Sequence, residues 1–168
     1  MARRKQDGIE IDEDLAHQRL EWRLERIGWT LMALLVLAAL LGLLGYGPMS
    51  RASAGDAATL SLDYDRVQRA SAPTEYRFHA APALSGNGEV RLRFDASLLE
   101  EVELESIRPE PREVRTGPGY TEFAFATDGG ERPADIVFQF RPATFGHVRG
   151  QVATQGAAPL LLDQYVLP

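Results

Sequence analysis

The pattern of apolar and polar residues changes near residue 47, and the two parts of the chain predict different structures. Between Arg26 and Arg51 no side chain carries a formal charge, and the segment 31–44 is apolar on every face of a helix. A bilayer core of about 30 Å needs about 20 helical residues, which is the length of Ile27–Tyr46. A helix of a soluble protein would keep a polar stripe. The pattern therefore predicts one transmembrane α-helix over 27–46.

Charged residues around this helix predict its direction of insertion. It is preceded by Arg19, Arg23 and Arg26, whereas Arg51 is the only basic residue just after it. Because positive charge is retained on the cytoplasmic side, we expect a cytoplasmic tail, 1–26, and a periplasmic C-terminal part in a bacterial inner membrane. The residue types that anchor helices at membrane interfaces also occur here, at Trp22, Trp29 and Tyr46.

A cleaved signal peptide is the alternative to a retained anchor. Residues 52–54 (Ala-Ser-Ala) have the small-x-small form of a cleavage site. The polar tail 1–26 and the apolar core are both longer than is usual for a signal peptide. We therefore expect a signal anchor, and cleavage after Ala54 stays open.

Two sets of residues are candidates for helix–helix contact. Leu20, Leu24 and Ile27 recur at helical spacing on one face, where they meet either lipid headgroups or a partner helix. Ala38 and Gly42 form a small-xxx-small pair, which lets two helices approach closely and would allow a homodimer.

After a linker, 47–57, the period changes to two, which is typical of strands with one buried face. Breakers rich in Gly and Pro separate the alternating segments, and Asn87-Gly88 is the clearest hairpin signal. The segment 97–101 would fit one helical turn. We predict an antiparallel, Ig-like β-sandwich of 7–8 strands over 58–168. The alternating segments are 59–64, 75–80, 90–95, 102–105, 120–126, 136–140, 148–152 and 160–166.

Composition limits the partners and the chemistry. The chain of 168 residues has a net charge of −6 and no basic cluster outside its N-terminal tail, so we expect no nucleic-acid partner. Cysteine is absent, which excludes disulfides and thiolate metal sites. Lys5 is the only lysine among 18 basic residues, a usage typical of GC-rich bacterial genomes. No motif indicates a cofactor.

Few side chains are candidates for catalysis. His79 and His147 lack any metal-ligand spacing, so a surface imidazole is the simpler interpretation of each. Glu101, Glu103 and Glu105 alternate along one predicted strand and would form either a cation site or cross-strand pairs with Arg91 and Arg93. No catalytic or metal-binding residue is assigned.

Several short segments resemble a group of uncharacterised bacterial single-pass inner-membrane proteins with a periplasmic β-domain. They are 25–29 (Glu-Arg-Ile-Gly-Trp), 47–50 (Gly-Pro-Met-Ser), 145–150 (Phe-Gly-His-Val-Arg-Gly) and 164–168 (Gln-Tyr-Val-Leu-Pro). The resemblance implies an accessory association with multi-pass membrane proteins of the YetF type, and it provides no known activity or catalytic residues.

The expected function is that of a non-enzymatic accessory or scaffolding subunit of a cell-envelope membrane complex, in contact with lipid and a membrane-protein partner. Two alternatives remain. An envelope hydrolase would need converging carboxylates in a cleft. A periplasmic glycan- or lipid-binding module would need a groove lined by aromatic residues such as Tyr64, Tyr76, Tyr120 and Phe123.

Overall fold

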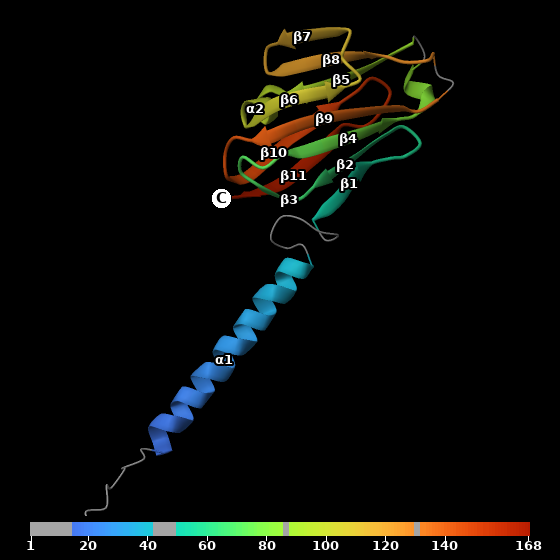
Figure 1. The fold of residues 1–168 in the computed structure, drawn as a ribbon. Coiled ribbons are helices and arrows are strands. Elements are labelled where there is room, and N and C mark those ends of the chain that lie inside the picture. Colours follow the sequence, from blue (N-terminus) through green and yellow to red (C-terminus); the bar gives the residue numbers. More distant parts are fainter. Residues whose placement is uncertain (1–14, 42–49, 86–87, 130–131) are drawn as a thin grey trace, which may run out of the picture. The chain divides into compact units, whose positions relative to one another are not determined.

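A computed structural model describes residues 15–41, 50–85, 88–129 and 132–168 (Figure 1). The chain divides into two compact units, Met1–Ala38 and Ala39–Pro168. Helix α1 runs from Leu15 to Leu40 and so begins ahead of the predicted transmembrane segment. Residues 42–46 of that segment lie outside the described residues.

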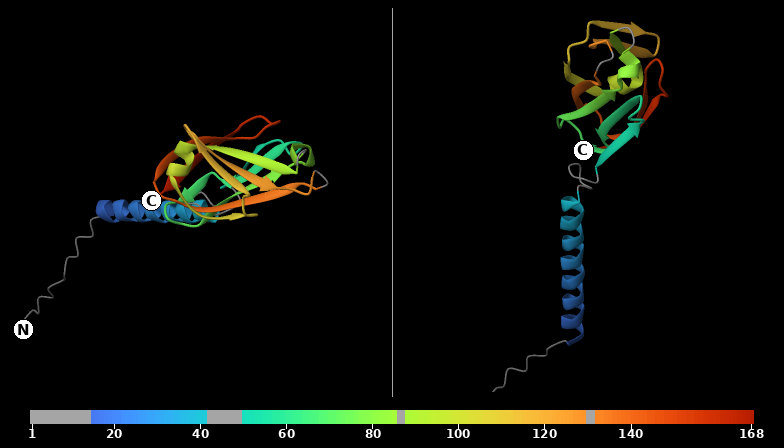
Figure 2. Two further views of the ribbon diagram at one scale, coloured as in Figure 1. Left: turned by 90° about the horizontal axis from the view of Figure 1, so that it is seen from above. Right: turned by 90° about the vertical axis from the view of Figure 1, so that its right-hand side faces the viewer.

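The second unit contains two β-sheets that enclose one apolar core, and the predicted all-β sandwich is confirmed (Figures 1 and 2). The first sheet has the order β1-β2-β4-β9-β6, and the second has the order β3-β11-β10-β5-β8-β7. The strands of the first sheet are β1 (Arg51–Gly55), β2 (Leu60–Asp65), β4 (Thr74–Ala80), β6 (Val102–Arg108) and β9 (Ala134–Pro142). Those of the second are β3 (Val67–Arg69), β5 (Glu89–Asp95), β7 (Glu113–Gly117), β8 (Tyr120–Ala126), β10 (Gly146–Ala153) and β11 (Leu160–Leu167).

The predicted number of strands, 7–8, is too low, because the described residues form eleven strands. The additional strands are β1, β3 and β7. They are sheet edges that have few large apolar side chains, so they lack the alternation that marks a half-buried strand. Strand β1 lies within the segment predicted as a linker, 47–57, and pairs with β2 over five residues.

Two predictions about strand pairing are wrong. Strand β3 pairs in parallel with β11, so the sandwich is not purely antiparallel. Asn87-Gly88 does not connect a hairpin, because β4 and β5 belong to different sheets. The connection from β4 to β5 contains the 3-10 helix η1 (Pro82–Ser85), and Asn87 lies outside the described residues. The predicted helical turn is present as α2 (Ala96–Glu100).

Phe138 on β9 is the centre of the aromatic core. Its ring lies 4.8 Å from that of Phe94 and 5.3 Å from that of Phe123, both of which belong to the opposite sheet. Phe78 and Phe125 also place their rings edge-on against it. Such edge-to-face pairs are favoured because the positive edge of one ring meets the negative face of the other. This cluster joins the two sheets.

One polar link crosses the core as well. The hydroxyl of Tyr76 on β4 donates a hydrogen bond to Oε1 of Gln164 on β11 at 2.5 Å. Nε2 of Gln164 donates to the carbonyl of Asp65 at 2.8 Å, and Gln68 donates to the same carbonyl at 3.2 Å. Both Tyr76 and Gln164 are buried, so each polar group depends on the other for its hydrogen bond. Burial raises the pKa of the Tyr76 phenol well above its usual value.

The chain enters the sandwich at Ser50, which is buried. Its Oγ donates to the carbonyl of Val67 at 2.8 Å, and its own carbonyl accepts from the backbone N–H of Arg66 at 2.6 Å. The sandwich therefore begins at Ser50, ahead of the candidate cleavage site after Ala54.

Candidate binding surfaces

Helix α1 exposes apolar side chains on all of its sides. The four consecutive residues Leu34–Leu37 are each at least half exposed, and at 3.6 residues per turn they surround the helix axis. Large exposed apolar residues continue on both sides of this segment, from Leu24 to Leu40. A surface of this kind favours contact with lipid or with another apolar helix.

The residues predicted to contact a partner helix or the membrane interface are distributed along this surface. Leu24, Ile27 and Trp29 are exposed, whereas Ala38 is partly buried. The guanidinium of Arg26 lies 3.8 Å above the ring of Trp22, a cation–π contact of about 0.5–1 kcal/mol at an exposed site. The other predicted positions are Arg19, Leu20 and Arg23, which lie within α1, and Gly42 and Tyr46, which lie outside the described residues.

In the described part of the chain, no helix is both long enough and apolar enough to count as a membrane span.

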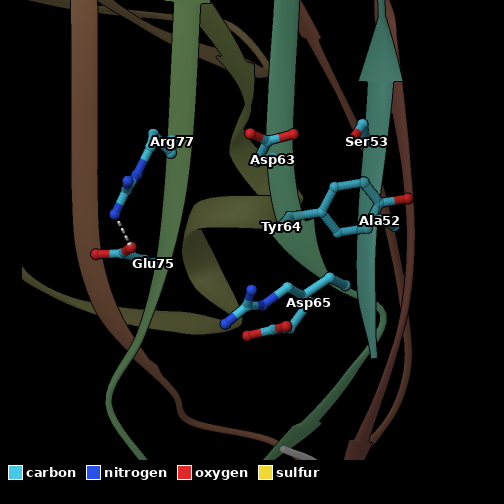
Figure 3. A pocket seen from close by; sticks show the side chains of 8 residues that line it. Ala52, Ser53, Asp63, Tyr64, Asp65, Glu75 and Arg77 are labelled. Atoms are coloured by element: carbon cyan, nitrogen blue, oxygen red, sulfur yellow. Dashed lines mark hydrogen bonds and ion pairs between the residues drawn. The ribbon is translucent and has the colours of Figure 1, made fainter. Parts of the chain in front are cut away.

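A depression of the sandwich surface lies on the first sheet, across β1, β2 and β4 (Figure 3). It is open and has a volume of about 500 Å³. Its charged side chains are of both signs, and Arg77 donates to Glu75 at 2.5 Å at one margin. Its lining comprises Arg51, Ala52, Ser53, Asp63, Tyr64, Asp65, Glu75 and Arg77. Because β1 is the edge strand of this sheet, the depression adjoins an unpaired strand edge.

Asp65 has the most perturbed carboxyl group of this depression. Burial raises the pKa of Asp65, and Glu75 raises it further, whereas Arg51 and the Ser50 hydroxyl lower it. Opposing effects of this kind are typical of a partly buried ion pair. The depression therefore presents two arginines and three carboxylates to a ligand, a set that suits a polar peptide surface of mixed charge.

His79 lies on the same face of the first sheet, between two carboxylates. Its Nδ1 is 2.6 Å from Asp135 and its Nε2 is 3.4 Å from Asp63. Ser61 stands opposite His79 on β2, and no hydrogen bond joins the two within the described residues. The imidazole thus lies between the carboxylates of Asp63 and Asp135.

The predicted pairing of Glu101, Glu103 and Glu105 with arginines 91 and 93 is wrong. Helix α2 carries the chain from one sheet to the other, so β5 and β6 are not neighbours. Strand β6 pairs with β9, where Arg141 donates to Glu105 at 2.5 Å. A register shift between Leu104 and Ser106 also interrupts the alternation. Glu105 is thus paired with Arg141, whereas Oε2 of Glu101 is buried and has no hydrogen-bond partner among the described residues.

Arg91 and Arg93 contact Glu122 on β8 instead, at 3.6 Å and 3.0 Å. The guanidinium of Arg93 also lies 4.3 Å above the ring of Tyr120. A small depression of about 170 Å³ adjoins this cluster. Each of these exposed pairs contributes about 0–1 kcal/mol, so the cluster is a charged sheet face and not a source of much stability.

The second histidine lies on the outer face of the second sheet. The ring of His147 on β10 stacks on Tyr165 of β11, with 4.7 Å between centroids, and it forms a hydrogen bond with Asp163. This hydrogen bond, with a smaller contribution from Arg149, lowers the pKa of the Asp163 carboxyl. His147 is thus a partner of a surface carboxylate.

The aromatic residues predicted for a glycan- or lipid-binding groove do not gather in one place. Tyr76 and Phe123 are buried in the core, Tyr64 contributes to the charged depression, and Tyr120 is partly buried beneath Arg93, so these four residues do not together line an aromatic groove. Within the described residues, no group of three or more His, Asp or Glu side chains is arranged to hold a metal ion.

Comparison with known proteins gives little about this chain. No protein-family model matches it, and neither does any curated protein. Among solved structures, it is similar to a cohesin module of a family 33 glycoside hydrolase from Clostridium perfringens. The identity is 12%, the TM-score is 0.42, and the alignment covers 69% of this chain and 98% of that module. A likeness this weak says nothing about function.

The charged depression was not found from the sequence. Alternation does place Asp63, Asp65 and Arg77 on outward faces, so one signal was present. The sequence did not indicate that β1 exists, or that β2 lies between β1 and β4, and the depression depends on both.

Proposed function

We propose that this chain is a membrane-anchored, non-enzymatic accessory subunit of a cell-envelope complex. The observation that carries the proposal is the apolar surface on every side of α1, in a stretch that stays free of charge from Ile27 to Ser50. Burying one large apolar side chain is worth about 1.5–3 kcal/mol, so covering this helix with lipid stabilises it strongly. A transmembrane helix over 27–46 satisfies this requirement.

The proposed orientation places the N-terminus in the cytoplasm and the sandwich in the periplasm. It is supported by Arg19, Arg23 and Arg26 ahead of the apolar stretch. Retention of the helix is supported by Ser50 and β1, because cleavage after Ala54 would remove a buried residue and most of an edge strand.

The accessory role is supported by the sandwich surface. Glu75, Asp135, Glu122 and Glu105 pair with arginines or histidines on the sheet faces, and eight aromatic side chains of the sandwich lie in its core. Candidate recognition features are the charged depression and the outer edge of β1, which pairs with no further strand among the described residues. An edge strand can pair with an extended segment of a partner, and neighbouring side chains then provide specificity.

Orientation is testable because the chain has no native cysteine. Ser97→Cys introduces one exposed thiol in the sandwich, and Ala2→Cys introduces one in the tail. We expect a membrane-impermeant maleimide, applied to intact spheroplasts, to label Ser97→Cys and to spare Ala2→Cys until the membrane is permeabilised. Equal labelling of the two variants, or recovery of the full-length chain in the soluble fraction, would refute the anchored orientation.

The adaptor surface is testable by crosslinking in native membranes followed by mass spectrometry. Asp63→Lys reverses a charge in the depression, and Glu113→Lys makes the same change on the exposed strand β7. Because unfavourable charge contacts at an interface cost several kcal/mol, we expect Asp63→Lys to lower partner recovery about tenfold or more, and Glu113→Lys to leave it unchanged. Truncation after Tyr46 should abolish it, and unchanged recovery after truncation would show that the sandwich is not the adaptor.

A further inference from the structure

The end of the sandwich at which the chain enters carries an exposed aromatic residue. Phe145 directly precedes β10 and is 76% exposed, the highest value among the large apolar side chains of the sandwich in the described residues. The strand register shows which residues lie at this end. Gly146 and Gln68 both pair with Val166 of β11, and Tyr165 pairs with Val67. Because Ser50 bonds to Val67 and Arg66, Phe145 and the point of chain entry lie at the same end of β11.

Two arginines accompany Phe145 there. Arg69 stands beside Leu167 on the far side of β11 from β10, and Arg66 directly precedes β3. Both side chains are exposed, and within the described residues neither forms an ion pair. Asp163, which lies on β11 two residues before Tyr165, is already paired with His147 and Arg149. This end of the second sheet, formed by Phe145, Tyr165, Arg66 and Arg69, is called the basal patch below.

An exposed aromatic ring beside unpaired arginines is the combination that binds the interface of a membrane. Chain length makes the lipid surface the nearest candidate. Tyr46, the last residue of the proposed span, is four peptide units from Ser50, and at about 3.5 Å per residue these units reach at most about 14 Å. The basal patch is therefore tethered close to the membrane that would hold α1.

We propose that the basal patch rests on that membrane, with Phe145 inserted at the boundary between headgroups and acyl chains and with Arg66 and Arg69 against anionic headgroups. This inference rests on the proposed membrane anchor. Contact of the patch with a protein partner is the competing outcome, and the experiment separates the two.

The test uses the full chain in vesicles of phosphatidylcholine with phosphatidylglycerol. Both native tryptophans, Trp22 and Trp29, lie in α1, so replacing them by Phe permits a single reporter in the sandwich. Phe145→Trp is the reporter variant. Leu161→Trp is its matched control, because Leu161 is 70% exposed on the same strand as Tyr165 and stands six residues, or about 20 Å, from the end of β11 at Leu167.

We expect lipids brominated near the headgroup to quench the fluorescence of the Phe145→Trp variant and to leave that of the Leu161→Trp variant nearly unchanged, since interfacial side chains lie about 5–10 Å into this boundary. The double variant Arg66→Gln with Arg69→Gln should lower the ratio of docked to free sandwich about 25-fold. Replacement of phosphatidylglycerol by phosphatidylcholine should also lower this ratio.

A chain that floats with the vesicles but shows equal quenching in the two variants would overturn the inference and leave the anchor intact. A chain that does not float would refute the anchor itself, and the inference with it. Protection of the indole in the Phe145→Trp variant only in native membranes, and never in lipid vesicles, would assign the patch to a protein partner and would also overturn the proposal.

Discussion

The polar link between the two sheets gives the most direct quantitative prediction. Tyr76→Phe removes one hydroxyl from the core and leaves the ring of residue 76 against Phe140, at 4.3 Å between centroids. Oε1 of Gln164 then loses its hydrogen bond inside the core, whereas Nε2 keeps the carbonyl of Asp65. The change is therefore one unpaired buried acceptor with almost no change in packing.

An unpaired buried polar group costs about 1–3 kcal/mol. We expect Tyr76→Phe to lower the free energy of unfolding of the sandwich by about 2 kcal/mol, which moves the urea midpoint down by about 1 M for a slope of about 2 kcal/mol per M. Gln164→Leu should cost as much or more, because it leaves the Tyr76 hydroxyl unpaired and removes one of two donors to Asp65. The other donor, Gln68, remains.

The assay is urea unfolding of residues 50–168, a fragment that contains every residue of the apolar core. The double variant Tyr76→Phe with Gln164→Leu removes both polar groups, so its cost should be smaller than the sum of the two single costs by about 1–2 kcal/mol. Additive costs within about 0.5 kcal/mol would refute the reasoning, because they would mean that the two side chains do not depend on each other.

Two further predictions concern single residues. Gly55 has φ +92°, and a Cβ there would lie 2.2 Å from the carbonyl oxygen of Leu60, so Gly55→Ala should destabilise the sandwich by about 2–4 kcal/mol in the same assay. Gly129→Ala is the matched control with φ +76° in open space, and an equal cost at both positions would contradict the clash. His147→Phe keeps a ring on Tyr165 but removes the hydrogen bond to Asp163, so the pKa of Asp163 should rise toward 3.8 in an NMR titration. Because the folded pKa of Asp163 lies below its unfolded value, this contribution to stability is complete above about pH 4 and is lost as the pH falls through the folded pKa. An unchanged pKa of Asp163 would refute the assignment.

The sequence predicted where the half-buried strands lie, because each of them alternates around large apolar residues. Leu60, Leu62 and Tyr64 are all buried, as their spacing indicates, and the same holds for Val90, Leu92 and Phe94. Strand β7 was missed because all of its residues except Gly117 are exposed, and an exposed edge strand needs no alternation.

Strand neighbours were not predictable in the same way. Alternation reports which side chains face the core, and it contains no information about which strand lies next to which. The pairing of β6 with β9 depends on α2 redirecting the chain, so the expected partners of Glu101, Glu103 and Glu105 were wrong. The same difference applies to the candidate surfaces. The apolar surface of α1 can be predicted from the sequence, whereas the basal patch depends on which strands lie next to each other.

The parallel pairing of β3 with β11 has a consequence for biosynthesis. Val67 pairs with Tyr165, almost one hundred positions later in the chain, and the second sheet lacks its last two strands until β11 arrives. Contacts between such distant segments carry a large loop-closure cost and form slowly. The sandwich therefore cannot close until β11 has been synthesised and has emerged from the ribosome or the translocation pore.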